Sequence, residues 1–64
     1  MKVTEITEEK YEVEKNGNKA VIKLDKHTNI FDGRNRLVWM FVYNGKEVIC
    51  IDKEHAFRMT EARL

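Results

Sequence analysis

The sequence predicts a mainly β fold, namely a small antiparallel sheet or a small barrel of four or five strands with a short C-terminal helical or 3₁₀ segment. Two observations favour it: an Asn-Gly pair lies between two β-branched and aromatic runs, and a second Asn-Gly lies between two alternating segments. The chain has 64 residues, of which 42% are hydrophobic and 36% charged. This composition is typical of a folded protein, and we expect one small domain spanning residues 1–64.

The clearest element is a hairpin with Asn44-Gly45 at its turn, because both residues tolerate the positive φ angles of a type I′ turn. This turn fixes the register of the two strands. On one side it pairs Tyr43 with Lys46, Phe41 with Val48, and Trp39 with Cys50; on the other it pairs Val42 with Glu47, Met40 with Ile49, and Val38 with Ile51.

Both sides of this hairpin are apolar, whereas a half-exposed hairpin alternates apolar with polar residues. The hairpin therefore needs cover on two sides. A chain of this length, with one cysteine and no disulfide, has little material to supply that cover. We expect sheet curvature, the C-terminal segment or a second chain to close one side.

A second hairpin is predicted at residues 11–24, with turn chemistry at residues 15–18. In its predicted register Glu14 faces Lys19, while one side collects five apolar residues: Tyr11, Val13, Ala20, Ile22 and Leu24. Because only that side is apolar, we expect this hairpin to lie over one face of the central hairpin.

The remaining segments are less regular. Residues 2–7 are rich in β-branched residues and predict an edge strand, although a loose helical spacing competes. Residues 25–36 are polar and predict a long connection with a tight turn at Asp32-Gly33, and long ordered loops are often functional. Asp52 is a plausible N-cap for residues 53–64, which we expect to be helical or a 3₁₀ turn leading into a final strand.

In size and hairpin placement, this pattern resembles the small barrels of SH3-like type. The resemblance rests on the Asn44-Gly45 hairpin and the turn after Asp52. The short motifs of signalling SH3 domains are absent, so the resemblance implies a barrel and no function.

Charge and targeting signals give a limited expectation about location. The formal net charge of +1 makes no general electrostatic case for nucleic acid or membrane. The longest apolar run, residues 37–43, is far shorter than the roughly 20 residues that cross a bilayer. The N-terminus lacks the apolar region of a secretory signal, and one cysteine fits a reducing compartment. We therefore expect a cytoplasmic protein with no membrane partner.

The residues of the types used in catalytic or metal sites have simpler interpretations. Cys50 lies mid-strand between two isoleucines and reads as a small buried hydrophobe. The spacing Cys50-x-Asp52-x-x-His55 supplies only three ligand types, and Asp52 is explained by a helix cap. Phosphate-loop and dinucleotide motifs are absent. We expect no metal site, no cofactor, no catalytic residues and no enzyme activity.

Two functions remain open. The first is a small intracellular interaction or regulatory protein, self-associating as a homodimer or binding another protein through a sheet surface; its candidate residues are Val38, Met40, Ile49, Ile51, Arg34 and Arg36. The alternative is a nucleic-acid-binding β-module, in which aromatic rings stack on bases and cations hold phosphates; its candidates are Trp39, Phe41, Tyr43, Lys26, Arg34 and Arg36. The simplest interpretation of the three aromatic residues is that they form the core.

Overall fold

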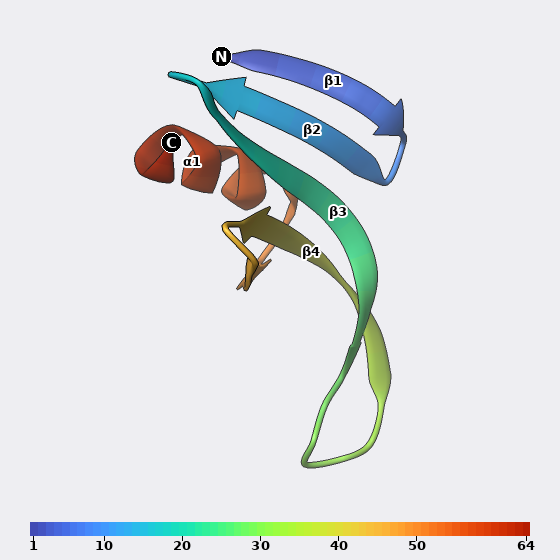
Figure 1. Ribbon diagram of the computed structural model, residues 1–64. Helices are drawn as coiled ribbons and strands as arrows, with labels where there is room; N and C mark the ends of the chain where they lie inside the picture. The colour runs from blue at the N-terminus through green and yellow to red at the C-terminus, as the bar shows by residue number, and fades with distance from the viewer.

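The computed structural model describes residues 1–64 and contains five strands followed by one helix. In chain order the elements are β1 (Lys2–Thr7), β2 (Lys10–Lys15), β3 (Asn18–Thr28), β4 (Asn35–Tyr43), β5 (Lys46–Cys50) and α1 (Lys53–Arg63). Each strand pairs antiparallel with the next one along the chain, so the sheet order is β1-β2-β3-β4-β5. Figure 1 shows this meander with α1 packed against one side of it.

Two Asn-Gly turns set the register of the sheet. Asn16 and Gly17 have φ angles of 54° and 78°, and Asn44 and Gly45 have φ angles of 52° and 74°. These left-handed conformations match a two-residue turn whose twist suits the flanking strands. Both predicted hairpins are confirmed, with Tyr11 opposite Ile22 and Phe41 opposite Val48.

One predicted pair of the central hairpin is wrong. Val38 was expected opposite Ile51, but β5 ends at Cys50 and Val38 pairs only with Asp25 of β3. The chain bends away after Cys50 because Asp52 begins the helix.

The predicted stacking of the two hairpins is also wrong. They join edge to edge through β3 and β4, which pair from Val21–Val42 to Thr28–Asn35. The connection predicted at residues 25–36 is consequently shorter, since its two ends extend β3 and β4 and leave residues 29–34 as the loop. Backbone pairing with a neighbouring strand gives these polar residues a β conformation that their side chains do not signal.

The C-terminal segment is an α-helix, and no final strand follows it. Asp52 caps it, because its carboxylate Oδ1 accepts a hydrogen bond from the His55 N–H at 2.7 Å. The other end is tied to the β2–β3 turn, where Lys15 Nζ donates to the Glu61 carbonyl at 2.8 Å. A cation at a helix C-terminus is favourable because that end carries partial negative charge.

The core lies between α1 and one face of the sheet. Val13, Ile22 and Phe41 are buried on the sheet side, and Ala56 is buried on the helix side. Thr60 is also fully buried, and its hydroxyl donates to the Ala56 carbonyl at 3.3 Å. Small residues at these two helix positions let the helix backbone approach the sheet closely.

The predicted fold class is confirmed as an open antiparallel sheet with a short C-terminal helix. The barrel is not formed, because β1 and β5 are both edge strands and do not pair with each other. The edge strand β1, predicted at residues 2–7, is present with the same bounds. Its register shifts between Glu5 and Thr7, an irregularity typical of sheet edges that resist pairing with another chain.

Because one side-chain cap begins the helix, Asp52→Ala should destabilise the protein by about 1 kcal/mol. Chemical unfolding followed by circular dichroism measures this free energy of unfolding. Asp32→Ala is the matched control, since the Asp32 carboxylate accepts from the Arg34 N–H at 2.9 Å in the exposed loop and touches no helix. Equal stability of the two variants would contradict the capping role of Asp52.

Candidate functional site: the open face and the arm

The sheet face opposite α1 has no element of this chain packed on it. Register places five apolar side chains on this surface, hereafter the open face: Val21, Val38, Met40, Val42 and Ile49. Met40 is only 5% exposed and Ile49 is 48% exposed. None of the five belongs to the core cluster beneath the helix. The molecule therefore carries a second apolar surface of its own.

Charged side chains surround the open face. One row across the sheet reads Glu12, Val21, Val42 and Glu47, so a carboxylate lies at each end of an apolar pair. A hollow of about 370 Å³ includes Glu12, Val21 and Val42 of this row, and its charged lining comes from Lys2, Glu12, Glu14 and Lys19. The hollow is shallow and mixed in charge, with Glu14 directly opposite Lys19 in the strand register.

The outer part of the β3–β4 hairpin forms a projecting arm, residues 25–38. Its strands pair only with each other, since β2 pairs with β3 no further than Lys23 and β5 pairs with β4 only from Trp39 onward. Figure 1 shows the arm extending away from α1 and β1. It accounts for the elongated shape of the molecule, which measures 40 × 21 × 18 Å.

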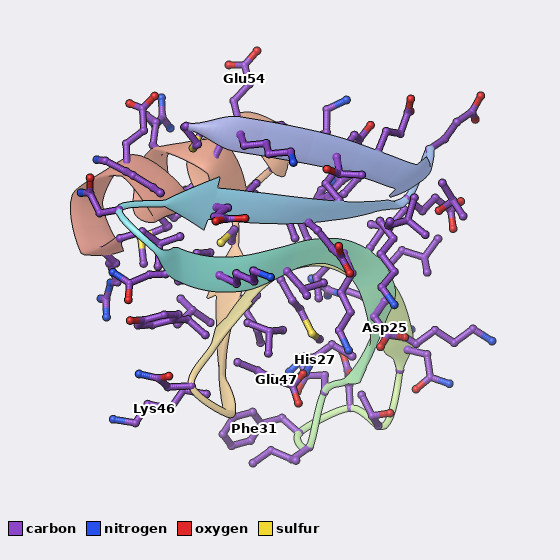
Figure 2. The ribbon with its side chains drawn as sticks, turned by 45° about the horizontal axis from the view of Figure 1, so that its top comes forward. Asp25, His27, Phe31, Lys46, Glu47 and Glu54 are labelled. Carbon is purple, nitrogen blue, oxygen red and sulfur yellow. The ribbon has the colours of Figure 1, made fainter.

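The tip of the arm presents two large apolar side chains to solvent. Ile30 is 89% exposed and Phe31 is 93% exposed. Figure 2 shows Phe31 at the end of the molecule far from the helix and β1. Three cationic residues lie behind the tip on the arm strands and loop: Lys26, Arg34 and Arg36.

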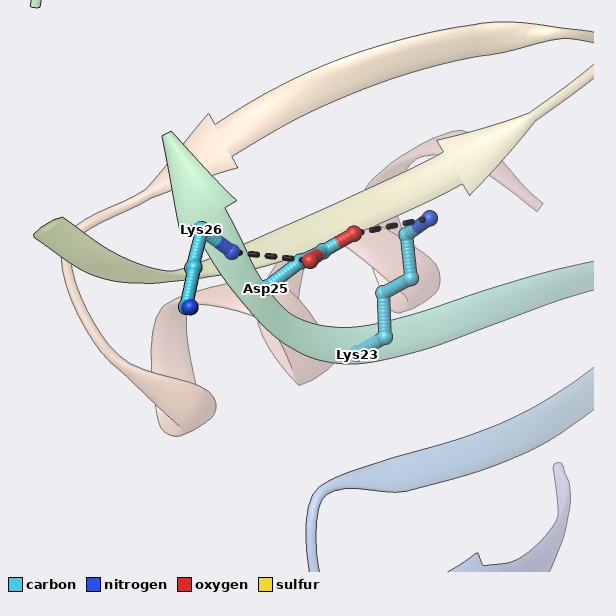
Figure 3. Close-up of polar contacts among 3 residues, drawn as sticks. All are labelled: Lys23, Asp25 and Lys26. Atoms are coloured by element: carbon cyan, nitrogen blue, oxygen red, sulfur yellow. Dashed lines mark hydrogen bonds and ion pairs between the residues drawn. The ribbon is translucent and has the colours of Figure 1, made fainter. Parts of the chain in front are cut away.

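A small polar network lies at the base of the arm (Figure 3). The Lys26 N–H donates to Asp25 Oδ1 at 2.8 Å, and Lys23 Nζ lies 3.5 Å from Asp25 Oδ2. The backbone hydrogen bond from Lys26, followed by the hydrogen bond from the Lys23 side chain, lowers the pKa of Asp25. The Asp25 carboxylate thus balances the positive charge of Lys23 within the chain.

The structure brings part of the predicted partner-binding set together. Val38, Met40 and Ile49 share the open face. Ile51 does not join them, because it lies beyond β5 in a bend and is 88% exposed. Arg34 and Arg36 lie on the arm, away from the apolar centre of the face.

The aromatic residues proposed for nucleic acid lie on the helix side of the sheet. Phe41 is fully buried, and Trp39 and Tyr43 pack partly buried against the same core. The ammonium group of Lys53 in α1 lies 6.0 Å from the centroid of the Trp39 ring. The three cations proposed to bind nucleic acid, Lys26, Arg34 and Arg36, therefore lie on the arm. The three aromatic residues are largely covered by the core packing beneath α1.

The three residues considered for metal or nucleophilic chemistry take part in other contacts. Cys50 is buried, and burial raises the pKa of its thiol. Asp52 caps the helix, and His55 Nδ1 accepts a hydrogen bond from the Ile51 N–H at 3.1 Å. No group of three or more His, Cys, Asp or Glu side chains is arranged to hold a metal ion.

Four residues of these surfaces were missed as site candidates: Val21, Val42, Ile30 and Phe31. The hairpin registers already put Val21 on the polar side of its hairpin and Val42 opposite Glu47, but only the β3–β4 pairing makes them neighbours. Ile30 and Phe31 are an apolar pair within a polar segment. Two adjacent large apolar residues in a polar loop were the sequence feature that could have indicated a site here.

A scan against protein-family models found no matching family, and searches of curated proteins and of solved structures gave no match. The only helix has eleven residues and is not long and apolar enough to span a membrane.

Cys50 gives a test of the helix-covered core that is independent of the open face. Its raised pKa keeps the thiol neutral in the folded state, while in the unfolded chain a thiol ionises above pH about 8.5. The unfolded state then binds fewer protons than the folded state, so stability should fall as pH rises above that value.

Urea unfolding at several pH values measures this slope, and Cys50→Ala should make it shallower. A thiol reagent should label Cys50 much more slowly in the folded protein than in denaturant. Equally fast labelling in both conditions would show that Cys50 is accessible.

Proposed function

We propose that this protein is a small, non-enzymatic interaction protein that forms a homodimer through its open face. The observation that carries the proposal is the apolar surface of Val21, Val38, Met40, Val42 and Ile49, over which no element of the chain lies. Ile49 is exposed, Val21, Val38 and Val42 are partly exposed, and Met40 is buried among them. Apolar surface that a small protein leaves uncovered marks an interaction site.

The exposed area supports this proposal. The chain exposes 4827 Å². A folded monomer of 7.6 kDa is expected to expose about 4,300 Å² from the scaling of surface with mass. The difference is roughly 500 Å², against about 800 Å² that each partner buries in a standard interface.

A second copy is the occupant that the charges favour. The open face carries acidic residues such as Glu12 and Glu47 and basic residues such as Lys19, and the formal net charge of the chain is only +1. Two copies therefore meet without strong net repulsion, and oppositely charged groups are available on each. A twofold symmetric dimer requires that the surfaces of one copy complement those it meets on the other.

The proposal predicts a dimer at micromolar concentration that a charge on the open face disrupts. Ile49→Lys should raise the dimer dissociation constant at least ten-fold, because a cation replaces an apolar side chain at the interface. Sedimentation equilibrium measures this constant, and circular dichroism checks that the variant folds.

Ile51→Lys is the matched control, since Ile51 is two residues away and even more exposed but lies off the face. It should dimerise like the native chain. A native chain that stays monomeric at every concentration would refute the proposal, and equal effects of the two substitutions would place the interface elsewhere.

A further inference from the structure

The tip of the arm is a second uncovered apolar feature, and its exposure is built into an ordered turn. The Asn29 N–H donates to the Arg34 carbonyl at 2.9 Å, and the Gly33 N–H donates to the Asn29 carbonyl at 2.8 Å. The Asn29 side chain accepts from the Phe31 N–H at 2.8 Å. These hydrogen bonds close the loop below the tip and hold the side chain of Phe31 in solvent.

The tip has no route to the open face of its own chain. The arm consists of four residue pairs, from Asp25–Val38 to Thr28–Asn35, and its strands extend about 13 Å beyond the rest of the sheet at about 3.3 Å per residue. Its strands are direct continuations of the β3 and β4 segments that form the open face. Because the arm is a hydrogen-bonded ribbon that extends away from the body of the sheet (Figure 1), contact between its tip and an open face requires a second molecule.

Charge matches the tip to the open face. Glu12 and Glu47 lie at the two ends of the Val21–Val42 row, and neither forms an ion pair within the chain. The arm carries three cations, Lys26, Arg34 and Arg36, against two carboxylates, Asp25 and Asp32, and the Asp25 carboxylate is already paired with Lys23. In a dimer in which these rows stack directly, the carboxylates lie near one another, whereas an arriving arm brings cations to them.

We propose that each copy docks its Ile30–Phe31 tip on the open face of the other, so that the dimer is held by reciprocal exchange of arms. The inference rests on the proposed homodimer and specifies how it is assembled. Phe31 supplies a large apolar contact to the Val21–Val42 row, with the arm cations beside Glu12 and Glu47. Reciprocity closes the assembly at two copies, whereas a one-way contact would continue into a chain of molecules.

Substitution of the tip tests this assembly without disturbing the fold, because Phe31 is 93% exposed. Phe31→Ser should raise the dimer dissociation constant about a hundred-fold, since the contact is lost twice in each dimer. Phe31→Leu is the conservative control and should retain most of the affinity. Sedimentation equilibrium on the full chain measures all three proteins.

Mixing two defective variants distinguishes arm exchange from direct stacking of faces. Phe31→Ser keeps an intact face and Ile49→Lys keeps an intact tip, so each alone should be monomeric. Their mixture should form heterodimers with one intact contact, seen by native mass spectrometry at the mean of the two homodimer masses.

Each result has a defined meaning. If Phe31→Ser dimerises like the native chain while Ile49→Lys does not, the open face is the interface and arm exchange is overturned. If the native chain is monomeric, the homodimer and arm exchange both fail. Salt-dependent binding of a single-stranded oligonucleotide that requires Phe31, without any effect of Phe31→Ser on dimerisation, would assign the arm to nucleic acid and overturn the inference.

Discussion

A single eleven-residue helix has to cover a five-stranded sheet, and it can cover only one of the two faces. The central strands are apolar on both sides, so the position of α1 decides which side becomes the core. The helix lies on the side with Phe41 and Trp39, the larger rings, where burial contributes most to stability. Ala56 and Thr60 make close approach possible, and the Asp52 cap and the Lys15–Glu61 hydrogen bond fix its two ends. The uncovered side, and with it the candidate interface, follows from this one contact.

Much of the sheet could be predicted from the sequence because two Asn-Gly turns determine the register of four of its strands. Asn16-Gly17 and Asn44-Gly45 accept left-handed backbone angles, and a two-residue turn leaves a hairpin only one register. The helix was ambiguous because it has few large apolar residues, and so gives only a weak 3.6-residue periodicity. The outer part of β3 was missed because its polar side chains face solvent on both sides. Its β conformation comes from pairing with β4, which is a tertiary interaction.

The candidate site was predictable only in part, for the same reason. Val38, Met40 and Ile49 followed from the hairpin register, but whether their side of the sheet is open depends on where the helix packs. Ile51 was included because the alternation was continued one pair too far, across the bend that leads to the Asp52 cap. Phe31 was overlooked because the segment around the Ile30–Phe31 pair is polar and predicts a loop. Its exposure becomes meaningful only once the loop is seen at the end of a projecting arm.

The meander topology also has a consequence for how the chain folds. Every strand pairs with its neighbour in sequence, so each strand pairing joins segments that are close along the chain. Local pairings of this kind lower the contact order, and proteins with low contact order fold quickly. The late event should be the closure of α1, because the Lys15–Glu61 hydrogen bond joins residues 46 positions apart. Until that closure both sheet faces are exposed, and a second copy encountered early meets two apolar surfaces rather than one.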